Sequence, residues 1–267
     1  MTERAPGKVN LSLFVGAPRA DGLHPLVSVV QAVTLADELT MQPAPVDEVV
    51  CPGVEGPNLA ARALAAFRAA TGWDEPQRIT IDKRIPVAAG MGGGSADAAA
   101  VLRLAARAAG GVEDGLLHDL AVRLGADVPS LLAPGRVLMT GAGEHIERLT
   151  DPAPFGLVIV PSSETLSTPA VYREFDRLGG ARAPDELAAC ADEARSGAVP
   201  PVNDLQDAAR SLCPAIDRAL DAVRAAGAGV AMVSGSGPTV FGTFDDLAAA
   251  RAAADVIPGA IALEPLS

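Results

Sequence analysis

The segment from Pro86 to Leu102, PVAAGMGGGSADAAAVL, constrains the fold of this chain more than any other. Residues 78–85 before it favour a strand. The Ala- and Leu-rich sequence after it predicts a helix with Ser95 as its N-cap and a stop at Gly110. Glycines let a backbone approach a ligand closely, and a helix start presents unpaired N–H groups with a partial positive charge. The segment therefore predicts an anion site, with a flexible connector as the alternative.

Two common phosphate motifs do not fit this glycine segment. The pattern GxxxxGK[ST] needs a lysine after its last glycine, and the chain has only Lys8 and Lys83. The dinucleotide pattern GxGxxG expects an acidic residue about 20 positions further on. Gly110 and Gly111 stand there instead. We therefore expect the loop to bind phosphate through a different architecture.

Composition excludes several classes of protein. With 21 basic and 33 acidic residues the formal net charge is −12, which disfavours binding to a nucleic-acid backbone. Cys51, Cys190 and Cys213 lie far apart and show no metal-ligand spacing with the three histidines, so we expect small buried thiols. No apolar run reaches the about 18 residues that span a bilayer, and the first residues lack a signal-peptide core. We expect a cytoplasmic protein without a membrane partner.

The order of elements predicts an α+β protein of two domains. Pro-rich sequence near residue 151 suggests a boundary, giving domains 1–150 and 151–267. In the first domain we expect strands at 9–15, 26–33, 78–85 and 137–140 and helices from 58 to a stop at Thr71 and Gly72, from 95, and at 116–124. In the second we expect a strand at 157–160, helices near 170–178, 184–195, 203–211 and 214–226, and then strand, turn, strand, helix and strand.

Three separated segments resemble the GHMP kinase superfamily: APGKVNLSL at 5–13, the glycine loop at 86–99, and VSGSGPTVFG at 233–242. RADGLH at 19–24 and LGADVP at 124–129 are similar to the branch that acts on 4-diphosphocytidyl-2-C-methyl-D-erythritol, as are STPAVY at 167–172 and NDLQ at 203–206. The resemblance implies an N-terminal domain like the second domain of ribosomal protein S5, a ferredoxin-like C-terminal domain, and an active site in the cleft between them. It also implies transfer of a phosphoryl group from ATP to the 2-hydroxyl of that substrate.

The resemblance implies two catalytic residues. Asp127 in LGADVP matches the aspartate that accepts the proton of the attacking alcohol, with a helix cap as the alternative. Lys8 matches the lysine that keeps this carboxylate ionised and stabilises the developing alkoxide, with a surface lysine as the alternative. We interpret Lys83, between Asp82 and Arg84, as a solvated strand end.

ATP and Mg²⁺ are the implied cofactors. The glycine loop would wrap the ATP phosphates, and the Ser95 hydroxyl would approach a phosphate or the metal. No metal ligand is assigned: Asp97 is compatible equally with Mg²⁺ and with the helix dipole. The loop residues are Pro86, Val87, Ala88, Ala89, Gly90, Met91, Gly92, Gly93, Gly94, Ser95 and Ala96.

The implied substrate is a small molecule that carries a cytidine diphosphate. Asn10 and His24 are candidates for substrate contacts, and His24 would bond the cytosine edge, with an exposed loop histidine as the alternative. Tyr172 matches an aromatic residue that stacks on the base. Leu23 stands where the family usually has a second one. Gly235 and Ser236 would close on the substrate, with a tight interstrand turn as the alternative. For the assembly we expect a monomer or weak homodimer.

Overall fold

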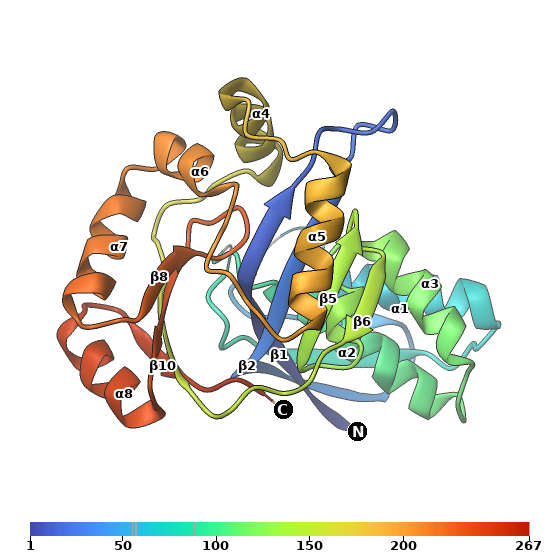
Figure 1. Ribbon diagram of the computed structural model, residues 1–267. Coiled ribbons are helices and arrows are strands. Elements are labelled where there is room, and N and C mark those ends of the chain that lie inside the picture. Colours follow the sequence, from blue (N-terminus) through green and yellow to red (C-terminus); the bar gives the residue numbers. More distant parts are fainter. Residues whose placement is uncertain (55, 57, 88, 267) are drawn as a thin grey trace. The chain divides into compact units, whose positions relative to one another are not determined.

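The computed structural model describes residues 1–54, 56, 58–87 and 89–266 (Figure 1). Two compact units are built from interleaved segments. The first unit comprises Met1–Gly7, Leu35–Val87 and Gly92–Pro134, and the second comprises Lys8–Thr34, Ala88–Met91 and Gly135–Ser267. The division of the sequence into 1–150 and 151–267 stays a prediction.

Strands β1 (Thr2–Val15) and β2 (Leu26–Pro43) pair with each other, and both contribute residues to both units. In the first unit, the end of β2 pairs antiparallel with β4 (Gln77–Asp82), and β3 (Glu48–Val50) runs parallel to β4. Side chains of β4 alternate between buried and exposed, because successive residues of a strand face opposite sides of a sheet. Its buried isoleucines join the apolar core of this unit.

Three helices complete the first unit: α1 (Leu59–Thr71), α2 (Gly93–Ala108) and α3 (Asp114–Leu124), followed by a 3-10 turn at Pro129–Leu131. As predicted, α1 ends at Gly72, whose φ is 72°. Nearly every residue of α2 from Ala96 to Ala106 is buried, which its small alanines allow because they let α1 pack closely against it. Its start thereby has a fixed place in the unit.

The second unit contains the first part of β2 together with β5 (Arg136–Gly141) and β6 (His145–Arg148). Strand β5 pairs antiparallel with β2 on one side and with β6 on the other. A separate antiparallel sheet has the strand order β10-β7-β9-β8. Its strands are β7 (Gly156–Val160), β8 (Val230–Val233), β9 (Val240–Phe244) and β10 (Ile261–Leu263). Helices lie between β7 and β8 and between β9 and β10, so the sheet has the β-α-β-β-α-β order of a ferredoxin-like fold, as expected.

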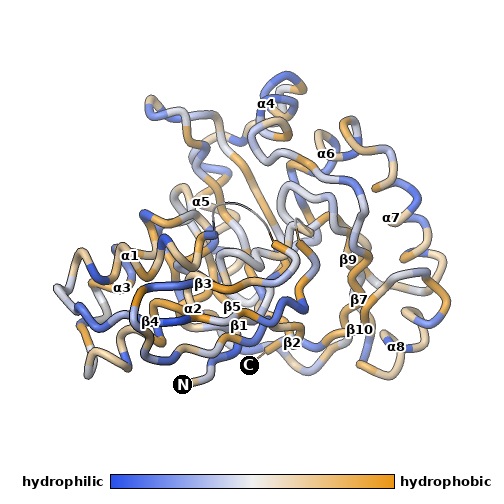
Figure 2. Tube along the Cα trace, turned by 180° about the vertical axis from the view of Figure 1, so that it is seen from behind, coloured by the Kyte–Doolittle hydropathy of each residue, from blue (hydrophilic) through white to orange (hydrophobic). Residues whose placement is uncertain are grey.

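The helices of the second unit are α4 (Thr168–Leu178), α5 (Pro184–Arg195), α6 (Gln206–Leu212), α7 (Ala215–Ala225) and α8 (Leu247–Val256). Helices α7 and α8 pack on the four-stranded sheet (Figure 1). The strands of that sheet are among the most hydrophobic parts of the chain (Figure 2), and their buried side chains form the core of this unit with those of α7 and α8. Within the described residues, no helix is long and apolar enough to cross a membrane.

Candidate functional site

Lys8 and Asn10 form a buried polar pair on β1. They are two residues apart, so both face the same side of the strand, and they are only 4% and 3% exposed. The Lys8 ammonium donates a hydrogen bond to Asn10 Oδ1 at 2.8 Å, and Asn10 Nδ2 donates to Ser28 Oγ at 2.8 Å. A buried, oriented cation is not the solvated lysine of a protein surface, so the surface alternative for Lys8 is wrong.

The glycine turn, residues 234–237 between β8 and β9, contacts this pair. The Asn10 N–H donates to Ser234 Oγ at 3.3 Å. Gly235 has a φ of +58°, and a Cβ atom there would lie 3.1 Å from Asn10 Oδ1 and 3.6 Å from Lys8 Nζ. Ser236 Oγ lies 2.9 Å from Thr168 Oγ1. The structure therefore brings the first and last of the family-like segments together.

The glycine loop contributes residues to both units. In the second unit, the Lys8 N–H donates to the Met91 carbonyl at 2.9 Å. A Cβ atom on Gly90 would lie 2.8 Å from the Gly237 carbonyl oxygen, so no larger residue fits without displacing the turn. Ala89 is buried, whereas Val87 is 63% exposed. Ala88 lies outside the described residues.

The start of α2 differs from the prediction. The N-cap is Gly92, with a φ of 69°, and the helix begins at Gly93, so Ser95 as N-cap is wrong. Gly92 adopts the left-handed conformation of this cap, which glycine does readily and other residues rarely. The helix therefore begins three residues earlier than predicted. The first helical hydrogen bond runs from Ala96 N–H to Gly92 O at 2.8 Å. The N–H groups of residues 93–95 thus precede the helical ladder and are available to an anion.

Lys83 is not a solvated strand end, and that interpretation is wrong. Its ammonium donates to Asp37 Oδ2 at 2.5 Å and to Asp97 Oδ2 at 2.9 Å. Asp37 also accepts from the backbone N–H groups of Arg84 and Ile85 at 2.6 and 2.8 Å. Asp37, Lys83 and Asp97 form a lysine cluster that connects the end of β4 with α2. Lys83 precedes the glycine loop in sequence and Asp97 follows it.

The cluster perturbs its ionisable groups. Burial raises the pKa of Asp97 to about 7, against the lowering effect of Lys83. Burial alone would lower the pKa of Lys83, but its hydrogen bond to Asp37 and the charge of Asp97 outweigh burial and raise it. Asp97 lies beyond the first turn of α2, so the helix-dipole alternative is wrong. Its Oδ1 is buried and has no hydrogen-bond partner within the described residues, and the metal-ligand alternative stays a prediction.

His24 and Tyr172 lie together in the second unit. The His24 ring is 4.8 Å from the Tyr172 ring between centroids, and its Nε2 lies 2.8 Å from Asp176 Oδ1. The His24 side chain is only 8% exposed, so it is not an ordinary exposed loop histidine. Leu23 beside it is 53% exposed. Asp176, which orients the ring, was not foreseen from the sequence.

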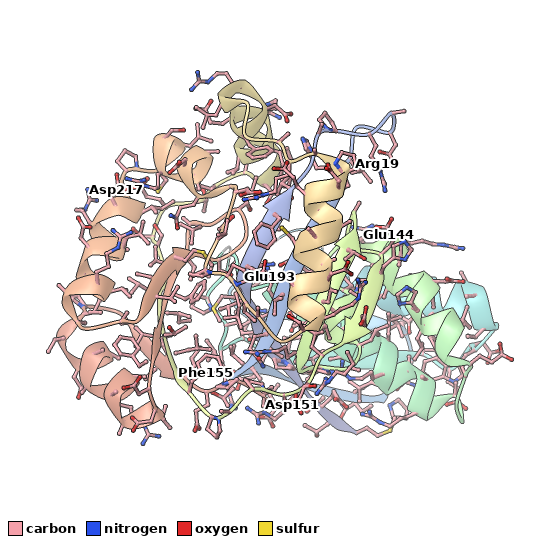
Figure 3. All side chains as sticks on the ribbon, viewed as in Figure 1. Arg19, Glu144, Asp151, Phe155, Glu193 and Asp217 are labelled. Atoms are coloured by element: carbon pink, nitrogen blue, oxygen red, sulfur yellow. The ribbon has the colours of Figure 1, made fainter. Side chains whose placement is uncertain are left out.

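The loop that carries Leu23 and His24 is fixed by charged side chains. Arg19 pairs with Asp21 at 2.8 Å and with Glu144 at 3.4 Å, and Figure 3 shows Arg19 and Glu144 near each other. Asp21 Oδ1 also accepts from the Leu23 N–H at 3.0 Å. The RADGLH segment is therefore shaped by its own Arg and Asp.

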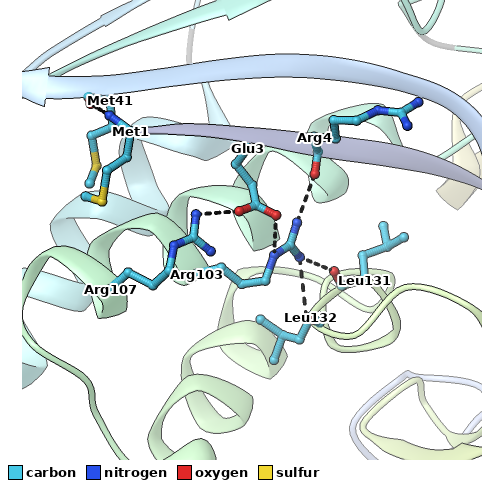
Figure 4. Close-up of polar contacts among 8 residues, drawn as sticks. All are labelled: Met1, Glu3, Arg4, Met41, Arg103, Arg107, Leu131 and Leu132. Atoms are coloured by element: carbon cyan, nitrogen blue, oxygen red, sulfur yellow. Dashed lines mark hydrogen bonds and ion pairs between the residues drawn. The ribbon is translucent and has the colours of Figure 1, made fainter.

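Asp127 belongs to the first unit, in the connection between α3 and the 3-10 turn, and is half-buried. Its backbone carbonyl accepts from Ser130 Oγ at 2.8 Å. The turn is held in place by Arg103 of α2, which donates to the Leu131 carbonyl at 2.5 Å and pairs with Glu3 at 3.2 Å (Figure 4). Arg103, whose side chain is half-buried, thereby holds the turn that follows Asp127.

Comparison with known proteins decides the family. The chain matches the GHMP kinases N terminal domain over residues 58–135 and the GHMP kinases C terminal domain over residues 180–261. It is 44% identical to a 4-diphosphocytidyl-2-C-methyl-D-erythritol kinase of Streptomyces avermitilis, covering 90% of this chain and 86% of the relative. The chain belongs to this kinase family. A Streptomyces coelicolor protein of the same name is also 44% identical, with 96% of this chain and 90% of that protein covered.

Solved structures agree with the family. A crystal structure of 4-(cytidine 5'-diphospho)-2C-methyl-D-erythritol kinase matches with a TM-score of 0.84 and 35% identity over 100% of both chains. A homoserine kinase from Cytophaga hutchinsonii matches with a TM-score of 0.67 at 19% identity, covering 97% of this chain and 95% of that one. The second likeness concerns the fold alone. The expected two-domain GHMP kinase fold is confirmed.

Several residues of these sites escaped sequence reasoning. Asp37 gives no local signal, because it stands beside Glu38 in a long strand without a recognisable motif. Lys83 stood out because it is one of the two lysines of the chain. Its charged neighbours, however, indicated a solvent-exposed position. Asn203 was noticed only within the family-like NDLQ, although it proves to be buried against the glycine turn.

Proposed function

We propose that this protein transfers the γ-phosphoryl group of ATP to the 2-hydroxyl of 4-diphosphocytidyl-2-C-methyl-D-erythritol, in non-mevalonate isoprenoid biosynthesis. One observation carries the proposal: relatives with that kinase name are 44% identical over most of both chains. The products are ADP and the 2-phosphate. The buried Lys8 and the glycine contacts around it support a site built for chemistry on a charged ligand.

Lys8 and Asp127 are the proposed catalytic residues. Asp127 accepts the proton of the attacking hydroxyl, which typically contributes about 10²–10⁴-fold to the rate. The Lys8 ammonium stabilises the alkoxide as it develops, an effect that is strong where water is excluded. The 4% exposure of Lys8 supports this role.

The glycine loop is the proposed site of the ATP phosphates. The N–H groups at the start of α2 supply donors for phosphate oxygens without adding charge, which suits an acidic chain. We propose that Mg²⁺ accompanies ATP, where it would neutralise phosphate charge. Phosphate oxygens and water usually provide most of its ligands, and Asp97 is the candidate for a protein ligand because its Oδ1 is buried without a hydrogen-bond partner in the described residues.

The cytidine end of the substrate is assigned to His24 and Tyr172. The contact between the two rings, 4.8 Å between centroids, supports a shared aromatic surface for a base. Asn10, Gly235 and Ser236 are proposed to contact the part of the substrate near the reacting hydroxyl. We further propose that the protein acts in the cytoplasm as a monomer or weak homodimer, which gel filtration with light scattering tests.

The test of the proposed function is a coupled assay of ADP release with Mg-ATP. The alcohols 4-diphosphocytidyl-2-C-methyl-D-erythritol, homoserine and mevalonate are compared in parallel, and the product of the first is checked for the 2-phosphate by ³¹P NMR. We expect turnover of the cytidine compound only. Turnover of mevalonate or homoserine without the cytidine compound would refute the proposal.

A further inference from the structure

The segment at residues 202–206 connects β1 with the glycine turn inside the second unit. The Leu13 N–H donates to the Val202 carbonyl at 2.8 Å, and the Asp204 N–H donates to the Leu13 carbonyl at 2.9 Å. These two bonds fix Asn203 opposite Leu13, a parallel bridge to the strand that carries Lys8 and Asn10. The segment is therefore attached directly to that strand.

The side chain of Asn203 extends from this bridge to the glycine turn. Its Nδ2 donates to the carbonyls of Val233 and Gly235, both at 2.8 Å, and its Oδ1 accepts from the Leu205 N–H at 2.9 Å. The residue is 8% exposed. Both amide hydrogens and the amide oxygen have partners, so the orientation of the amide is fully determined. The two carbonyls that it binds flank Ser234 in sequence.

A second side chain of the same segment strengthens the connection. Gln206 Oε1 accepts a hydrogen bond from the Val233 N–H at 3.0 Å. Together Asn203 and Gln206 bind the backbone on both sides of Ser234, whose hydroxyl accepts from the Asn10 N–H. The turn therefore has two independent attachments to β1, one through Ser234 and one through the segment at 202–206.

We propose that Asn203 is a positioning residue, which holds Ser234 and Gly235 at the distance from Lys8 and Asn10 that phosphoryl transfer requires. The proposal rests on the proposed function, because it takes Lys8 as the catalytic cation. The spacing is tight: a Cβ atom on Gly235 would already lie 3.1 Å from Asn10 Oδ1. A displaced turn would thus change the surroundings of the Lys8 ammonium directly.

Asparagine suits this task for a chemical reason. The arrangement needs two N–H donors for two carbonyls and one acceptor for a third backbone group, all in one plane. The side-chain amide supplies that set, whereas aspartate of the same shape supplies acceptors only. In Asn203→Asp a carboxylate oxygen would therefore face two carbonyl oxygens and repel them, while the bond from the Leu205 N–H is kept.

The kinetic test compares Asn203→Asp and Asn203→Ala with wild type at a temperature at which circular dichroism shows each protein folded. Asp207→Ala is the matched control, since Asp207 is an exposed residue of α6 directly after the segment and pairs with Arg210. We expect kcat to fall about 10²-fold in Asn203→Asp and by less in Asn203→Ala, with the KM for ATP within threefold, because a misplacement of about 1 Å can cost this much. Wild-type kcat in both Asn203 variants would overturn the proposal.

A second test does not depend on activity. The chain has two lysines, so ¹³Cε-lysine labelling gives two side-chain signals, which Lys83→Arg assigns. We expect both Asn203 variants to shift the Lys8 signal and leave the Lys83 signal in place, and the control to shift neither. An unshifted Lys8 signal overturns the proposal whatever the kinetics show. If the wild type fails to phosphorylate the cytidine compound, the proposed function fails, and the Lys8 signal still decides whether Asn203 positions the glycine turn against Lys8.

Discussion

Replacement of Asp97 by Asn changes how the stability of the protein depends on pH. The pKa of Asp97 is about 7 in the folded protein, compared with 3.8 for an unperturbed aspartate, because the side chain is buried. A difference of about 3 pH units is worth about 4 kcal/mol at about 1.4 kcal/mol each. Between about pH 4 and pH 7, Asp97 is protonated in the folded state and ionised in the unfolded state, because its pKa is higher in the folded state. This contribution to stability is therefore present at low pH and is lost as the pH rises towards 7.

Urea unfolding of wild type and Asp97→Asn at several pH values tests this reasoning. Measurements start near pH 5.5, to stay above the pI of about 4.6. At pH 5.5 the protonated Asp97 still contributes about 2 kcal/mol to the free energy of unfolding, and this contribution is lost by pH 8. We expect the free energy of unfolding of Asp97→Asn to rise relative to wild type by about this amount between these two pH values. Asp255→Asn, at an exposed position, should show no such trend. A difference between Asp97→Asn and wild type that stays constant with pH would refute the assignment of a raised pKa.

Four further predictions concern activity and stability. Asp127→Asn should lower kcat by about 10²–10⁴-fold and leave the KM for ATP nearly unchanged in steady-state assays, and near-normal turnover would remove Asp127 from its role. Gly235→Ala should lower kcat/KM at least tenfold, because the new methyl group would lie 3.1 Å from the Asn10 amide in a left-handed conformation; unchanged kinetics would show that the turn yields easily. Arg103→Met should lower the free energy of unfolding by about 1–3 kcal/mol, since the carbonyl of the buried Leu131 loses this donor, against about 0–1 kcal/mol for Arg107→Met at a half-exposed site; equal losses in urea titrations would contradict this. Leu23→Tyr should lower the KM for the cytidine compound by adding a stacking surface, and an unchanged KM would place Leu23 outside the base pocket.

The fold follows from the sequence where hydrophobic patterns are long and have clear ends. Helix α5 lies at Pro184–Arg195 as predicted, and α1 ends at the predicted Gly72. The strand, turn, strand, helix and strand at the end of the chain are confirmed, because each is separated from the next by glycine, proline or aspartate. The short strands β3 and β6 were missed, since β3 has three residues and β6 is the polar sequence HIER. Strands of this kind are defined by their neighbours and have almost no pattern of their own.

The candidate site was predictable only in part, because its ion pairs join distant segments. Lys83 and Asp37 are 46 residues apart, so sequence neighbours gave the wrong environment for Lys83. The N-cap of α2 was assigned to Ser95 from side-chain preference, whereas the backbone conformation of Gly92 determines where the helix starts. His24 was expected to be available to a base through its ring nitrogens, and the contact with Asp176 appears only once α4 is in place.

Glycines at two positions explain why the family-like segments meet in the second unit. Gly90 leaves 2.8 Å between a hypothetical Cβ atom and the Gly237 carbonyl, and Gly235 leaves 3.1 Å to Asn10. The distance at Gly90 is shorter than real Cβ atoms show, so the loop can pack on the turn only if this residue lacks a Cβ atom. At Gly235, which has a positive φ, a Cβ atom would press on the Asn10 side chain. Gly235 has no side chain that could hold the turn in place. The backbone of the turn is therefore held by the Asn203 amide and by the Ser234 hydroxyl. The glycines therefore permit the approach of these segments, and the polar side chains around them determine where it stops.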